Sequence, residues 1–198
     1  TFHSYIHCCA SRKSALRNLV VSMAVLVSLA FSATVISPPA AGASLLAPKS
    51  KCHGQNLRAG SGKARTSMLC MTNFARKKSG LRAYRHVGLL DRSATRKSAD
   101  IFRCGFSHEA CGRKFTYWQE KLGYIGGGCW EAGENIAWGS GSLGTVRSIF
   151  NAWMHSPGHR AAILSRNYTE IGIGQKRGEF DGYSGSSVWV QQFGHRGC

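Results

Sequence analysis

Three ionisable side chains in this 198-residue sequence could together form a chemical site: His108, Glu134 and His159. Each directly follows a small residue and is expected at the boundary of a helix, strand or turn. Two imidazoles and a carboxylate are a suitable ligand set for Zn²⁺ or a similar divalent cation, with one position left for water. The alternative interpretation is structural, because a carboxylate can accept backbone N–H bonds and a histidine can hydrogen-bond a loop carbonyl.

Other catalytic motifs are incomplete. His108-Glu109 begins like the zinc motif H-E-x-x-H, but Gly112 stands where the second histidine is needed. The sequence contains no G-x-S-x-G nucleophile elbow and no paired aspartates of the kind used by glycosidases. The run Gly126-Gly127-Gly128 lacks the lysine and the spacing of a phosphate-binding loop.

The elements that position these residues can be predicted from apolar spacing and caps. Ser156 is expected to cap a helix that has Pro157 at its first position, directly before His159. Helices that precede strands, with short connections, predict an α+β fold with a small antiparallel sheet flanked by helices. We expect helices over 64–78, 89–102, 115–122 and 143–153, a strand or buried turn over 135–138, and strands over 168–176 and 187–193 joined by a Gly- and Ser-rich hairpin with Asp181-Gly182.

The N-terminal region has the pattern of a secretory signal peptide. Basic residues precede an apolar run over 19–36, and Ala41-Gly42-Ala43 has the form of a cleavage site. An uncleaved membrane anchor is the alternative, because the run is close to the length that can span a bilayer. We therefore expect a signal region over 1–43, an extended lead-in over 44–63 and a single domain over 64–198, with no span in the mature protein.

Six cysteines follow the signal region, an even number that is typical of an exported, disulfide-stabilised protein. A zinc–cysteine cluster is the rival interpretation, but the sequence has no C-x-x-C pair. The spacing alone leaves the pairing open. The pairing we expect is Cys52–Cys70, Cys104–Cys111 and Cys129–Cys198.

The chain is strongly basic, with 26 Lys and Arg against 9 Asp and Glu and a formal net charge of +17. Such a surface is attracted to anionic partners, among which we expect an anionic cell envelope or lipid. A basic surface that only aids solubility is the plainer interpretation. Nucleic acid is the least supported partner, because it rests on charge alone and the chain is predicted to be exported.

Four motifs together carry a resemblance to a known family. They are Phe106-Ser107-His108, Gly133-Glu134-Asn135-Ile136-Ala137, Trp153 to Arg160 (W-M-H-S-P-G-H-R) and Glu170-Ile171-Gly172-Ile173-Gly174. In this order and spacing they resemble the bacterial branch of the CAP superfamily, which contains cysteine-rich secretory, antigen 5 and pathogenesis-related class 1 proteins and whose domain is also called SCP. Asn73 and Arg76, followed by Gly80-Leu81, are similar to the first helix of bacterial members.

The resemblance implies an α-β-α sandwich with a cleft that holds two His and two Glu and binds a divalent cation in some members. His108, Glu134 and His159 match three of the four positions. His155-Ser156 occupies the place of the second Glu, so Ser156 is expected to line the cleft instead.

The resemblance does not fix the function, because the family includes lipid- and sterol-binding proteins, toxins, defence proteins and a few proteases. We expect a secreted binding module for lipid, cell envelope or a small hydrophobic ligand. The alternative is a metal-dependent hydrolase in which His108 and His159 hold Zn²⁺ and Glu134 is the general base.

Overall fold

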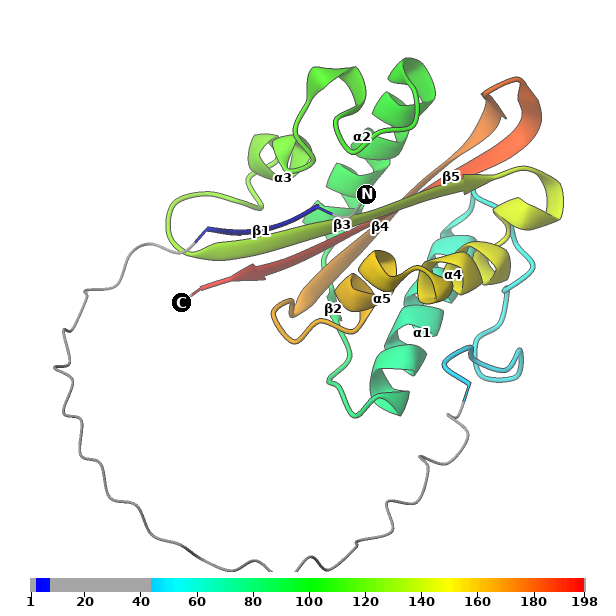
Figure 1. The fold of residues 1–198 in the computed structure, drawn as a ribbon, viewed down its shortest axis with the longest axis horizontal. Helices are drawn as coiled ribbons and strands as arrows, with labels where there is room; N and C mark the ends of the chain where they lie inside the picture. The colour runs from blue at the N-terminus through cyan, green and yellow to red at the C-terminus, as the bar shows by residue number, and fades with distance from the viewer. Residues whose placement is uncertain (1–2, 8–43, 198) are drawn as a thin grey trace, which may run out of the picture.

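The computed structural model describes residues 3–7 and 44–197, and it places one sheet between two layers of helices (Figure 1). The strand order is β1-β3-β5-β4-β2. The predicted α-β-α sandwich is confirmed. The helices are α1 (Gly62–Lys78), α2 (Gly88–Cys104), α3 (Tyr117–Lys121), α4 (Val146–His155) and α5 (Pro157–Ile163), and the strands are β1 (His3–His7), β2 (Arg85–His86), β3 (Trp130–Gly139), β4 (Glu170–Phe180) and β5 (Tyr183–Arg196).

The first helix, α1, ends at Lys78 as predicted and begins at Gly62, two residues before the predicted start. The Ser61 hydroxyl accepts the Ala64 N–H at 3.1 Å and caps the N-terminus. Lys77 and Lys78 lie in the last turn, where cations are favourable to the helix dipole. Gly80 then takes a φ of 69°, a left-handed conformation that glycine adopts without strain.

The sheet is mixed rather than wholly antiparallel, which corrects the expectation. Strands β3, β5 and β4 pair antiparallel, and the two-residue β2 pairs parallel with β4. A strand of two residues is too short to show an alternating pattern, so the sequence contains no sign of it. Strand β3 is also longer than the predicted 135–138 segment. The residues on either side of that segment show only a weak alternation of apolar and polar side chains, so the sequence does not indicate that they belong to the strand.

The hairpin between β4 and β5 is tighter than predicted. Only Asp181 and Gly182 separate the two strands, with φ values of 52° and 77°. Positive φ at both central residues is the geometry that two-residue hairpins favour, and Asp-Gly is one of the sequences that adopts it. The Gly- and Ser-rich stretch that was expected to be a loop forms the start of β5 instead.

Two glycines in β4 let α2 lie directly on the sheet. A Cβ at Gly172 would overlap with the Leu90 carbonyl carbon, and a Cβ at Gly174 would overlap with the Ala94 carbonyl carbon. These atoms belong to the helix backbone, which cannot relieve an overlap by a change of rotamer as a side chain can. The glycines of Glu170-Ile171-Gly172-Ile173-Gly174 therefore set the distance between α2 and the sheet.

The core is divided between the two faces of the sheet. Helices α1, α4 and α5 cover one face and α2 and α3 cover the other (Figure 1). The larger cluster contains Met68, Phe150, Trp153 and Trp189. On the α2 side, Ile101, Ile136 and Val190 form a smaller cluster. Both clusters contact β3, the strand that carries Glu134.

Two of the three expected disulfides are present, Cys52–Cys70 and Cys104–Cys111. The third expected pair includes Cys198, which lies outside the described residues, so this pair stays a prediction. The Gly197 N–H donates to the Cys129 carbonyl at 3.0 Å, which brings the last described residue beside Cys129.

Most of the predicted signal region also lies outside the described residues. Its described part is β1, which pairs antiparallel with β3 and places His3 opposite Glu134. In the described ranges, 3–7 and 44–197, no helix is both long and apolar enough to cross a membrane. The boundaries at residues 43 and 63 stay predictions.

Candidate functional site

Strand β3 positions both candidate histidines through two adjacent residues. Successive side chains of a strand point to opposite faces, so Glu134 and Asn135 leave β3 on different sides. Glu134 Oε1 lies 2.9 Å from Nδ1 of His108. Asn135 Nδ2 donates to the backbone carbonyl of His159 at 3.1 Å. The Gly133-Glu134-Asn135 segment therefore fixes the loop before α3 on one side and α5 on the other.

Glu134 is completely buried and its two oxygens have separate partners. Oε1 accepts from His108, and Oε2 accepts from Nε2 of Gln192 at 3.1 Å. A buried carboxylate of this kind is stable only when it is hydrogen-bonded and paired. If His108 donates through Nδ1–H, its lone pair is on Nε2, and the ring orientation is set by Glu134. Glu134 is therefore a positioning residue for His108.

His159 is the second imidazole of the site, and Ser156 holds it. Ser156 is the N-cap residue of α5, as predicted, but its side chain makes no capping bond. Its hydroxyl lies 2.8 Å from Nδ1 of His159 instead. Burial, together with the neighbouring His108, lowers the pKa of His159 to about 4. The imidazole of His159 is therefore neutral at physiological pH.

The structure brings the predicted site residues into one region but does not arrange them as three ligands. Among the described residues, no three or more His, Cys, Asp or Glu side chains converge as metal ligands. Glu134 does not fit a direct ligand role, because both of its oxygens already accept hydrogen bonds. Imidazole nitrogens are donors of the kind that Zn²⁺ prefers, and Glu134 has the place of an outer carboxylate that orients His108.

Two polar residues of the site were not predicted. Gln192 on β5 faces Glu134, and Lys97 on α2 donates from Nζ to the His108 carbonyl. Lys97 is 2% exposed, and burial lowers its pKa while the nearby Glu134 opposes that effect. The sequence did hold a sign of Lys97, since it lies on the same helical stripe as Leu90, Ala94 and Ile101.

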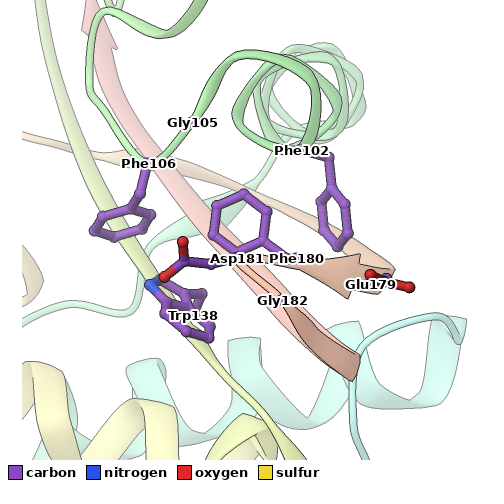
Figure 2. Close-up of a pocket in the computed structure, with 8 residues that line it drawn as sticks. All are labelled: Phe102, Gly105, Phe106, Trp138, Glu179, Phe180, Asp181 and Gly182. Atoms are coloured by element: carbon purple, nitrogen blue, oxygen red, sulfur yellow. The ribbon is translucent and has the colours of Figure 1, made fainter.

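An aromatic pocket of about 430 Å³ adjoins these segments (Figure 2). Phe106 lies two residues before His108, and Trp138 lies four residues after Glu134 on the same face of β3. The rings of Trp138 and Phe180 are 5.3 Å apart, and those of Phe102 and Phe180 are 5.2 Å apart. We name this cavity the aromatic pocket; its lining is Phe102, Gly105, Phe106, Trp138, Glu179, Phe180, Asp181 and Gly182.

The aromatic pocket exposes apolar surface that the fold leaves uncovered. Phe106 is 46% exposed, and Tyr183, whose ring lies 5.9 Å from that of Trp138, is 56% exposed. In the view of Figure 2, the Asp181 carboxylate lies between Phe106 and Trp138, and Glu179 lies at the right, below the Phe102 ring. The lining therefore combines aromatic rings with the carboxylates of Glu179 and Asp181, and a concave site with both kinds of group suits a small molecule.

One known bacterial protein is similar to this chain in sequence. The chain is 35% identical over 126 residues to the uncharacterized protein YkwD of Bacillus subtilis, a match that covers 62% of this chain and 44% of YkwD. The chain thus spans less than half of the length of that relative.

Two solved structures share the fold. An outer surface protein of Borrelia burgdorferi aligns with a TM-score of 0.58 at 18% identity, over 71% of this chain and 98% of that protein. An extracellular SCP-domain protein of Bacillus anthracis aligns with a TM-score of 0.52 at 23% identity, over 66% of this chain and 39% of that protein. At these identities the likeness concerns the fold alone.

The family comparison covers most of the described domain. Residues 69–193 match the cysteine-rich secretory protein family, CAP. This range contains His108, Glu134, Ser156 and His159, together with the two glycines that seat α2 on the sheet. The chain belongs to the CAP family of cysteine-rich secretory proteins.

Proposed function

We propose that this protein is a secreted binding module that takes a small hydrophobic ligand, such as a lipid chain, in the aromatic pocket. The observation that carries the proposal is the exposed ring of Phe106 beside Trp138 and Phe180 in a cavity of about 430 Å³. Transfer of apolar surface from water is favourable by about 25 cal/mol per Å², so a ligand that covers these rings gains affinity.

The alternative function, a metal-dependent hydrolase, has less support. It requires Glu134 to take a proton from a bound water. Both oxygens of Glu134 are instead used by His108 and Gln192, and the side chain is fully buried. A general base has to reach the proton that it removes. Peptide cleavage by the wild type in the presence of zinc, lost in Glu134→Gln, would restore this alternative.

A divalent cation belongs to the proposal as a second ligand, held at the imidazoles. His108 and His159 would supply nitrogen donors, and Zn²⁺ is the cation that such donors suit best. Titration of the oxidised protein with zinc in a calorimeter tests this role, beside the variant His108→Ala/His159→Ala. Equal affinity in both proteins would remove the cation from the account.

Secretion is supported by the disulfides Cys52–Cys70 and Cys104–Cys111, which persist in oxidising compartments. The net charge of +17 supports an anionic cell envelope as the surface that retains the protein. Retention on anionic envelope preparations should fall steeply with added salt. Retention that salt does not change would contradict the electrostatic part of the proposal.

The aromatic pocket is tested with Nile red, a neutral apolar dye whose fluorescence rises when it is bound. We expect binding by the wild type and a loss of at least about tenfold in Phe106→Ala/Trp138→Ala. Leu143→Ala is a matched control, because Leu143 is 68% exposed and does not line the aromatic pocket. Dye binding that is equal in all three proteins would contradict the proposal.

A further inference from the structure

A second cavity, of about 540 Å³, lies at the end of α1 and has a cationic lining. Its walls are the segment after α1, with Arg82 and Arg85, and the segment between α5 and β4, with Arg166, Tyr168 and Thr169; Arg76 completes the lining. We name it the arginine pocket. It shares no lining residue with the aromatic pocket, and it contains neither His108 nor His159.

Arg76 brings a buried positive charge to the arginine pocket. The residue is 3% exposed, and its guanidinium donates to the carbonyls of Arg82, Ile163 and Ser165 at 2.7, 2.8 and 2.8 Å. It also stacks on the ring of Tyr84, with Cζ 3.4 Å from the ring centroid. Within the described part of the chain, no carboxylate forms an ion pair with it. Carbonyl dipoles satisfy the N–H groups of Nε and Nη1 but leave the net charge uncompensated.

The other arginines add to this positive potential. Burial lowers the pKa of Arg76, Tyr84 opposes this effect, and the charge of Arg166 adds to it, so the two cations lie within each other's field. Arg82 and Arg166 are exposed, and in residues 44–197 neither forms an ion pair. Arg85 does pair with Glu170, but that carboxylate is also shared with Arg196 at 3.5 Å. The arginine pocket therefore has more guanidinium groups than carboxylates to neutralise them.

We propose that the arginine pocket binds a phosphate group. Guanidinium presents a planar fork of N–H donors that matches two oxygens of one phosphate, and the concave low-dielectric wall strengthens the attraction. An anion there would also relieve the repulsion between Arg76 and Arg166. The volume lies within the range of small-molecule sites, so an organic group attached to the phosphate can enter as well.

This inference deepens the anionic-partner part of the proposed function by giving the partner a chemical group and a place. Binding of phosphate in the arginine pocket rests on the proposed function only where an anionic envelope is taken as the source of the phosphate group. A phosphate can come from solution, from a phosphate monoester or from a phospholipid headgroup. Free phosphate, glycerol 3-phosphate and vesicles of phosphatidylglycerol, with phosphatidylcholine vesicles as reference, distinguish these sources.

The test measures the affinity of the whole oxidised protein for each probe at low salt. Arg82→Ala/Arg166→Ala removes two pocket cations. The backbone carbonyl at position 82, which accepts from Arg76, stays in place. Lys49→Ala/Lys63→Ala is the matched control, since it removes the same net charge at exposed positions that do not line the arginine pocket. Arg82→Lys/Arg166→Lys keeps the charge but removes the planar fork. Thermal melts verify that each variant is folded.

We expect the pocket variant to lose at least about tenfold in affinity for the probe that the wild type binds, and the control to lose about twofold or less. The lysine variant should fall between them. Equal losses in the pocket variant and the control would overturn the inference in favour of a diffuse surface field, and so would a wild type that binds none of the probes. Neither of these outcomes changes Nile red binding, because the two pockets share no lining residue. A failure of the phosphate proposal is therefore distinguishable from a failure of the aromatic-pocket proposal.

Discussion

Glu134 and Asn135 are adjacent residues of β3 that hold the two candidate histidines from opposite faces of the sheet. Glu134 accepts from the His108 ring at 2.9 Å, and Asn135 donates to the His159 carbonyl at 3.1 Å. Because the two contacts share one rigid strand, the distance between the histidines is fixed by the sheet rather than by the loops. The Gly-Glu-Asn segment is thus the structural centre of the site.

Glu134→Gln should lower the free energy of unfolding by about 1–3 kcal/mol, because it leaves the His108 ring without its carboxylate partner and removes a negative charge near the buried Lys97. It should also change the tautomer of His108, which nitrogen chemical shifts of the ring report. Glu179→Gln is the control; Glu179 is exposed, so its loss should stay within about 0.5 kcal/mol. A melt and a ring spectrum unchanged by Glu134→Gln would show that the carboxylate does not position His108.

Gly174→Ala should destabilise the fold by about 3 kcal/mol, because the new methyl group meets the backbone of α2. Urea unfolding followed by circular dichroism gives the value. Gly126→Ala is the matched control, since nothing lies within 4 Å of a Cβ there and its φ is not positive. If both variants unfold at the same urea concentration, α2 does not depend on this close approach.

The pH dependence of His159 has a definite sign. Its pKa is lowered to about 4 in the folded protein, below the value of 6.5 of an unperturbed imidazole. The unfolded chain therefore binds the proton first as the pH falls, and stability decreases between about pH 6.5 and pH 4. Above this range the group contributes no pH dependence. Proton NMR of the ring should give the low pKa, and a value near 6.5 would mean that His159 is solvated.

The disulfide Cys52–Cys70 closes the longer of the two described loops, with a separation of 18 residues against 7 for Cys104–Cys111. In the chain-entropy account, its removal by Cys52→Ser/Cys70→Ser costs about 3 kcal/mol. The cost for Cys104→Ser/Cys111→Ser should be smaller. Thermal melts of both variants test this order, and the reverse order would mean that native-state contacts outweigh loop entropy.

The fold was predictable where the signal is local. The apolar spacing of α4 indicates this helix, and Ser156-Pro157 places the start of α5 directly before His159. Glu134, which was expected at the boundary of an element, lies in the middle of β3 instead. The parallel pairing of β2 was not predictable, because only the folded sheet brings residue 85 beside residue 170. The Asp181-Gly182 turn was predictable from its residue types, but the extent of the strands beyond it depends on pairing across the whole hairpin.

The chemistry of the site was less predictable than its location. His108, Glu134 and His159 were expected as equal members of a ligand set, yet the partners of Glu134 give it a positioning role. That role depends on Gln192, 58 residues further along the chain. The aromatic pocket was missed because Phe102, Trp138 and Phe180 come from three separate elements, and each alone has the pattern of an ordinary core residue.

The most direct test of the account is the Nile red titration of the oxidised protein and its Phe106→Ala/Trp138→Ala variant. The account predicts saturable binding by the wild type, a loss of at least about tenfold in the variant and no loss in Leu143→Ala. Binding that is absent from the wild type, or equal in all three proteins, would contradict the claim that this CAP domain is a binding module for a hydrophobic ligand.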